Sequence, residues 1–211
     1  MHFDSTAIAA MDERERAAFI NSLSGYKSAN LVGTADAQGH TNLAIMSSVV
    51  HLGSHPPLLA LVVRPGLEER HTLSNLLASG EYSINHVTGD ITHAAHQTAA
   101  RYDRSVSEFV ATGLTPEWVE GFGAPFVLEA GIKLGMTLRE HQELAINGTH
   151  LVIGEIVHAL LPAGCLLDNG AVDLARAGTV ALSGLDTYSK PEPIARMAYA
   201  KPDLPPRELG G

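Results

Sequence analysis

The stretch from Leu58 to Gly80 reads LLALVVRPGLEERHTLSNLLASG and combines a strand, a loop and a helix. Leu58 to Val63 is an apolar run whose length and β-branched content suit a buried strand. Pro65-Gly66 ends that run and opens a loop. The leucines of LSNLLAS then recur at the i, i+3, i+4 spacing of one helix face. Gly80 stands where the C-terminal glycine of a helix belongs, so the sequence predicts strand, loop and helix in that order.

Polar side chains stand at both ends of the predicted loop. Arg64 closes the strand, while His71 and Thr72 open the helix. Free N–H groups at a helix start carry partial positive charge and favour an anion, above all a phosphate. An arginine can add a bidentate fork to the same phosphate. The alternative is that Thr72 only caps the helix and Arg64 is a solvated strand end.

Composition and charge narrow the class of protein. The chain has 211 residues, of which 45% are hydrophobic and 18% charged, which predicts one globular domain over residues 1–211. Its net charge of −9 argues against binding nucleic acid or an anionic membrane. Cys165 is the single cysteine, which excludes an intrachain disulfide and a cysteine-based metal cluster. Without a signal peptide or a membrane-spanning apolar run, we expect a soluble, cytoplasmic protein.

The remaining pattern predicts a mainly β protein with helices at its margins. We expect a helix over 12–24, a helical insertion over 90–123 with short turns of helix at 91–100, 106–111 and 116–120, and an extended C-terminal arm over 190–211. Strands are predicted at 30–35, 41–46, 49–52, 58–63, 81–87, 132–139 and 149–161. The regular strand–helix alternation of a parallel sheet is absent, so we expect a barrel-like β core with α decoration.

The common nucleotide and hydrolase motifs are missing from the sequence. It contains no GxGxxG, no GxxxxGK[ST], no GxSxG and no HExxH. His93 and His96 lie one helical turn apart, with His86 nearby, but no carboxylate stands at a matching position. We therefore predict no metal site.

The segment Asn42 to Ser48 carries a second polar feature. Its predicted strand ends in Ser47 and Ser48, which places hydroxyls and free backbone N–H groups beside the strand 58–63. Such a site can hydrogen-bond the polar edge of a heterocycle. The alternative is a β-bulge with two solvated serines.

These segments, taken in order, resemble the flavin reductase-like family of FMN-binding split-barrel proteins. The resemblance rests on the order and spacing of several short motifs and covers roughly residues 25 to 200. The motifs are NLA with the two serines at 42–48, HPPLL at 55–59, Arg64, HTLSN at 71–75, EYSIN at 81–85, VIGEIV at 152–157 and LSGLDTY at 182–188. Where the family commonly has lysine-aspartate before the threonine, this chain has Arg70-His71.

The resemblance implies an FMN-binding split β-barrel with an inserted helical lobe, and it implies a set of site residues. The implied flavin-binding residues are Met46, Ser47, Ser48, Val62, Val63, Arg64, His71, Thr72 and Asn85. Ser47 and Ser48 would contact the isoalloxazine, and Arg64, His71 and Thr72 would hold the phosphate. The residues expected on the nicotinamide or substrate side are Phe122, His158 and Tyr188. Phe122, between two glycines, would either swing over the flavin or be a buried side chain.

The function implied by the resemblance is that of an NAD(P)H-dependent flavin reductase. The cofactor would be FMN, with FAD as the alternative, and NADH or NADPH would be the reductant. The chain would form a homodimer and would pass electrons to a partner oxygenase or another acceptor. Two alternatives remain: a non-catalytic FMN-binding electron carrier, and a flavoenzyme acting on a specific organic substrate. No catalytic acid or base is predicted, because hydride transfer belongs to the cofactor.

Overall fold

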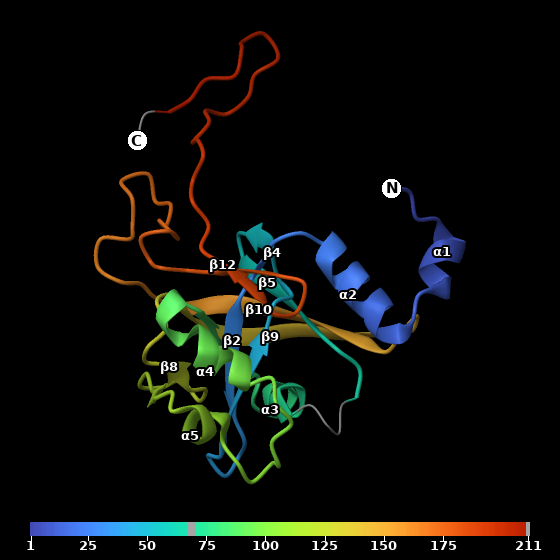
Figure 1. The fold of residues 1–211 in the computed structure, drawn as a ribbon. Helices are drawn as coiled ribbons and strands as arrows, with labels where there is room; N and C mark the ends of the chain where they lie inside the picture. The colour runs from blue at the N-terminus through green and yellow to red at the C-terminus, as the bar shows by residue number, and fades with distance from the viewer. Residues whose placement is uncertain (67–70, 210–211) are drawn as a thin grey trace.

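The computed structural model describes residues 1–66 and 71–209, and it is mainly β (Figure 1). Its helices are α1 (Ser5–Ala10), α2 (Glu13–Leu23), α3 (His71–Ser79), the 3-10 turn η2 (Gly89–Ile91), α4 (Thr92–Gln97) and α5 (Glu108–Thr112). The strands of the main sheet are β2 (Asn30–Ala35), β3 (Thr41–Met46), β4 (Val49–Ser54), β5 (Pro57–Val63), β6 (Glu81–His86), β9 (Lys133–Leu144) and β10 (Thr149–Leu160). The short strands are β1 (Lys27–Ser28), β7 (Pro116–Glu117), β8 (Phe126–Val127), β11 (Ala181–Ser183) and β12 (Thr187–Ser189).

The main sheet curls until its two edge strands meet. Its seven strands are antiparallel and follow the order β3-β2-β6-β9-β10-β5-β4. β3 and β4 occupy opposite edges of this order, yet Ser47 and Ser48 alone connect them. The Val62 N–H of β5 donates to the Ser48 carbonyl at 3.0 Å, which extends the β4–β5 pairing to within two residues of the end of β3. The sheet therefore forms a barrel that is interrupted where the two serines lie.

Helix α3 packs against one face of the curled sheet. Leu73 and Leu76 are fully buried in a core cluster with Tyr82 and Val152, and each buried leucine stabilises the fold by about 1.5–3 kcal/mol. Gly80 ends the helix at φ +75°, a conformation that costs glycine little. The predicted strand 58–63 and the leucine face after it are thus confirmed. Arg70, which departs from the family pattern, lies outside the described residues.

The helical insertion packs against the other face of β2 and against β3. Leu31 and Leu43 join Ala95 of α4 and Phe109 of α5 in a second buried cluster. The last predicted turn of helix in this insertion is wrong. Pro116–Glu117 is a strand, β7, because it pairs antiparallel with β8.

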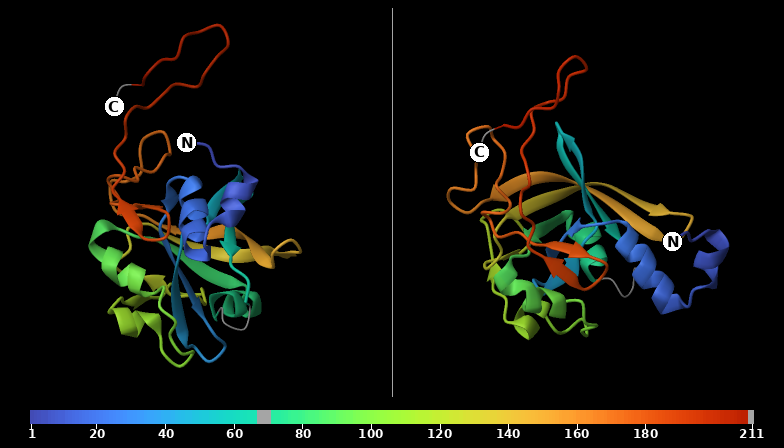
Figure 2. Two further views of the ribbon diagram at one scale, coloured as in Figure 1. Left: turned by 45° about the vertical axis from the view of Figure 1, so that its right-hand side comes forward. Right: turned by 45° about the horizontal axis from the view of Figure 1, so that its top comes forward.

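Both ends of the chain lie outside the core. Neither α1 nor α2 has a buried residue, although α2 begins and ends within one residue of the prediction. The small sheet β1-β11-β12 leads into the C-terminal arm, which we define as residues 190–209. This arm projects from the barrel in both views of Figure 2 and turns back on itself through a bridge between Met197 and Glu208. The assignment of residues 1–211 to a single domain remains a prediction.

Candidate flavin site

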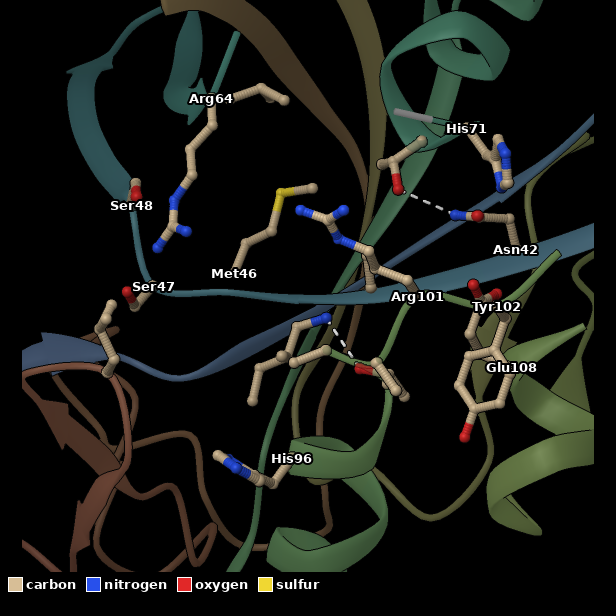
Figure 3. A pocket seen from close by; sticks show the side chains of 18 of the residues that line it. Asn42, Met46, Ser47, Ser48, Arg64, His71, His96, Arg101, Tyr102 and Glu108 are labelled. Carbon is tan, nitrogen blue, oxygen red and sulfur yellow. Dashed lines mark hydrogen bonds between the residues drawn. The ribbon is translucent and has the colours of Figure 1, made fainter. Parts of the chain in front are cut away.

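A pocket of about 870 Å³ opens beside the seam of the barrel (Figure 3). Its walls come from the end of β3, the end of β5, the first residues of α3, the part of the helical insertion from α4 to α5, and the small sheet. The lining residues include Asn42, Met46, Ser47, Ser48, Val62, Val63, Arg64, His71, Thr72, His96, Thr98, Arg101, Tyr102, Asp103, Arg104, Glu108, Leu182, Leu185 and Tyr188. Small-molecule sites span about 300–1,000 Å³, so the pocket is near the upper end of that range.

The structure brings eight of the nine predicted flavin-binding residues together in this pocket. They are Met46, Ser47, Ser48, Val62, Val63, Arg64, His71 and Thr72. They meet because Ser48, two residues after β3, pairs with Val62 near the end of β5, and because α3 is the next described element after β5. Tyr188, predicted on the nicotinamide or substrate side, lines the same pocket.

Asn85 is placed elsewhere, and its predicted role is corrected. It lies in β6 with no exposed surface. Its Nδ2 donates to the Leu31 carbonyl at 3.0 Å and to Ser83 Oγ at 2.8 Å, and its Oδ1 accepts from the Val127 N–H at 3.0 Å. These partners occupy both ends of the amide, so Asn85 ties β2, β6 and β8 together inside the protein.

Phe122 and His158 are also placed away from the pocket. Phe122 is 5% exposed, and its ring centroid lies 5.4 Å from that of Phe126 and 5.1 Å from that of His158. Neither Phe122 nor His158 is a lining residue of the pocket. The structure thus corresponds to the alternative in which Phe122 is a buried side chain.

Thr72 is held by a buried polar network at the base of the pocket. Asn42 Nδ2 donates to Thr72 Oγ1 at 2.8 Å (Figure 3). Asn42 Nδ2 also donates to Thr34 Oγ1 at 3.4 Å, and Asn75 Nδ2 donates to the same oxygen at 3.2 Å. An amide nitrogen only donates, so Thr72 Oγ1 accepts from Asn42 and keeps its own proton. That proton is available to an acceptor in the pocket.

The part of the helical insertion from α4 to α5 is hydrogen-bonded to the outer edge of β3. The Leu43 N–H donates to Glu108 Oε2 at 2.9 Å, and the Ile45 N–H donates to Thr98 Oγ1 at 2.9 Å. Thr41 Oγ1 and Ser107 Oγ share a third hydrogen bond of 2.7 Å. Edge strands expose unpaired backbone groups, and these contacts satisfy two of them. Burial raises the pKa of Glu108, although the hydrogen bond from Leu43 opposes that shift.

Sequence reasoning missed the residues that the insertion contributes to the pocket. Arg101 and Arg104 come from the RYDR loop after α4, and His96 comes from α4 itself. His96 Nδ1 lies 3.1 Å from the Tyr188 hydroxyl, which joins the insertion to the small sheet. Arg101 and Arg104, two arginines within four residues, are the feature of the sequence that could have indicated this wall of the pocket. Within the described part of the chain, no group of three or more His, Cys, Asp or Glu residues is arranged to hold a metal ion.

The residues of this pocket match the chemistry of a flavin mononucleotide. Arg64, His71 and the Thr72 hydroxyl supply donors for a phosphate, as charged and hydroxyl groups do in anion sites. Ser47 and Ser48 supply hydroxyls beside the apolar side chains of Met46 and Val62, which suits a planar ring with one polar edge.

Comparison with known proteins identifies the family. Residues 23–173 match the model of the flavin reductase-like domain, so the chain belongs to that family. A crystal structure from Shewanella frigidimarina NCIMB 400, assigned as a flavin reductase with a split barrel domain, is 54% identical, covers 95% of this chain and 100% of its own, and has a TM-score of 0.92. The predicted family and the split-barrel fold class are thereby confirmed.

One more distant solved structure shares the fold, and two curated sequences match part of the chain. Component B of nitrilotriacetate monooxygenase from Bacillus cereus has a TM-score of 0.79 at 21% identity, over 92% of this chain and 96% of its own. An uncharacterized protein of Aquifex aeolicus is 27% identical over 126 residues, or 59% of this chain and 63% of its own. YwrF of Bacillus subtilis, also uncharacterized, is 28% identical over 60% of this chain and 64% of its own. The match thus spans less than two thirds of the length of either curated relative.

The family and the fold together support a flavin-related oxidoreductase. In the described residues, every helix is too short or too polar to cross a membrane.

Proposed function

We propose that this chain binds FMN in the pocket and acts as an NAD(P)H-dependent flavin reductase. One observation carries the proposal: eight of the nine residues that the resemblance implies for flavin binding line the same pocket. The bound flavin would supply the hydride chemistry, and the protein would supply binding and orientation. Thr72, His71 and Arg64 would hold the phosphate, while Ser47 and Ser48 would bind the polar edge of the ring.

The proposal extends to the assembly and the acceptor. We propose a homodimer that passes electrons to a partner oxygenase or another acceptor. Supporting observations are the apolar side chains that the chain leaves exposed on β4 and on the C-terminal arm, Val50, Leu52, Ile194 and Tyr199. Scattered exposed apolar side chains are ordinary, whereas groups of them mark interaction surfaces.

The visible absorption spectrum of the purified full chain tests the central claim. We expect a flavin spectrum, either as purified or after adding FMN, that bleaches when NADH or NADPH is added without oxygen. A chain that neither holds nor rebinds flavin contradicts the proposal.

Steady-state assays separate the reductase from its two alternatives. A reductase consumes NAD(P)H continuously when free flavin is supplied. An electron carrier binds flavin but shows no steady turnover, and an enzyme for an organic substrate leaves free flavin unreduced.

A further inference from the structure

Two histidines meet on the long hairpin of β9 and β10. His141 Nε2 lies 3.0 Å from His150 Nδ1, and the ring centroids lie 5.2 Å apart with their planes at 22°. Neither histidine is among the described residues that line the flavin pocket. The two stand nine positions apart and come together because β9 and β10 pair, so the local sequence pattern does not reveal them.

The register of the hairpin places a carboxylate on the same face of the sheet. Glu143 is the direct partner of His150, and His141 is the direct partner of Val152. Directly opposed residues of an antiparallel pair have their side chains on one face, as have residues i and i+2 of one strand. His141, Glu143 and His150 therefore stand as neighbours on one face of the hairpin, and all three are of types that bind metal ions.

The separation of the two imidazole nitrogens suits two ligands of one metal ion. Imidazole nitrogen binds Zn²⁺ at about 2.0–2.1 Å, which puts two such nitrogens roughly 2.8 Å apart at a right angle and roughly 3.4 Å apart at the tetrahedral angle. The 3.0 Å between His141 Nε2 and His150 Nδ1 lies inside this interval. One ring now donates a proton to the other. When that proton moves to the second nitrogen of its own ring, both facing nitrogens present lone pairs.

Burial fixes one of these side chains and leaves the other two adjustable. His150 is 4% exposed, and its strand is paired on both sides, with Glu143 of β9 and with Val63 of β5. His141 and Glu143 are exposed, so each can turn toward an ion held by His150. As the described side chains stand, the two imidazoles are in contact, and Glu143 joins them by a side-chain rotation.

We propose that His141, His150 and Glu143 bind a divalent transition metal of the zinc class, with water at the remaining position. Two imidazoles and one carboxylate are a donor set that zinc proteins use, whereas Mg²⁺ and Ca²⁺ prefer oxygen ligands. The net charge of −9 favours the approach of a cation. This site is independent of the proposed function, because none of the three is among the described residues that line the flavin pocket.

Calorimetric titration of the untagged full chain with ZnCl₂, after treatment with a chelator, tests the site. Loss of a group that only supports a ligand already weakens metal binding about tenfold to a hundredfold, so His141→Ala should weaken it by at least roughly tenfold. His141 is exposed, so this variant should fold as wild type does. Glu143→Gln should also weaken binding. As a matched control, His93→Ala removes an exposed histidine of α4 that stands one helical turn from His96, and the affinity should not change.

Thermal unfolding provides the second measurement. A metal ion stabilises the state that binds it, so ZnCl₂ should raise the unfolding midpoint of wild type and of His93→Ala more than that of His141→Ala. MgCl₂ should leave all three midpoints unchanged.

Three results would overturn the inference. The first is a wild-type chain that does not bind Zn²⁺, and the second is equal affinity in wild type and His141→Ala. The third is a loss in His93→Ala as large as that in His141→Ala, which would assign the ion to the histidines of α4. Unchanged affinity in Glu143→Gln, together with a loss in His141→Ala, would overturn the assignment of the carboxylate.

Discussion

Thr72 has one hydroxyl proton, and its oxygen already accepts a hydrogen bond from Asn42. The hydroxyl therefore keeps its own proton, which it can donate to a further acceptor such as a ligand in the pocket. The sequence predicts Thr72 at the start of a helix, where α3 has it, but its hydrogen bond with Asn42 joins residues thirty positions apart. Local patterns do not reveal such a contact.

The first prediction concerns the phosphate. Thr72→Val and Arg64→Ala should each weaken FMN binding roughly tenfold to a hundredfold, because each removes a donor to a charged group. Riboflavin, which lacks the phosphate, should bind both variants as it binds wild type. Fluorescence titration with the two flavins measures this difference. A parallel loss of riboflavin affinity would show that these residues support the fold and do not contact the phosphate.

Glu108 gives a pH-dependent prediction. Burial raises its pKa above the ordinary value of 4.5, so the folded chain binds this proton more tightly than the unfolded chain. The contribution of Glu108 to the free energy of unfolding is therefore fully present below the pKa that it has in the unfolded chain. It is lost as the pH rises through the raised pKa of the folded chain. Glu108→Gln keeps an acceptor for the Leu43 N–H but does not titrate.

Urea unfolding of wild type and Glu108→Gln across pH 4 to 7 checks the sign. The difference in unfolding free energy should move in favour of the glutamine variant as the pH increases. A difference that stays constant, or moves toward wild type, contradicts a raised pKa at Glu108.

At the scale of elements, patterns of apolar residues identified most strands, while packing determined the rest. β2 and β3 have the predicted bounds, since each is a short β-prone run next to a turn. The sequence pattern of 116–120 predicts a turn of helix, but pairing with Phe126–Val127 makes Pro116–Glu117 a strand. The position of the insertion against β3 could not be predicted, because the hydrogen bond of Thr98 spans fifty-three residues.

Phe122 shows why a local motif misled the prediction of the site. Its flanking glycines look like a hinge, yet Phe126 and His158 enclose the ring. Asn85 is a similar case: it stands near the end of a strand, but its side chain points into the protein and not toward the pocket. Whether a side chain on a strand points toward the pocket or into the core depends on which face of the sheet is buried at that position. The curl of this sheet decides that, and the curl arises from pairing between strands far apart in the sequence.

Phe122→Ala should therefore act on stability. Truncating a buried aromatic side chain costs about 3–5 kcal/mol, through lost burial and the cavity that remains. Thermal and urea unfolding should show this loss, while FMN affinity of the folded variant should match wild type. A variant of wild-type stability with an altered Michaelis constant for NADH would instead support a gating role for Phe122.

At the scale of the whole molecule, the exposed apolar side chains of the C-terminal arm support the proposed homodimer. Ile194 and Tyr199 in the C-terminal arm are 102% and 92% exposed, and the described backbone contacts of the arm join it mainly to itself. Exposing apolar side chains without a partner is unfavourable by roughly 25 cal/mol per Å². An arm of this kind gains stability when a second copy of the chain covers it.

Deleting residues 191–211 should shift the protein from dimer to monomer, because the arm would lie across the neighbouring subunit. Light scattering coupled to size exclusion measures the mass of both forms over a range of concentrations. A milder variant, Ile194→Ser with Tyr199→Ser, keeps the arm and removes only its apolar contacts, so it should weaken the same association. Because the lining residues of the pocket precede the arm, flavin binding by the isolated subunit should survive both changes unless the partner completes the site. A dimer of unchanged stability in both variants would exclude the arm from the interface and leave β4, with Val50 and Leu52 exposed, as the surface to mutate next.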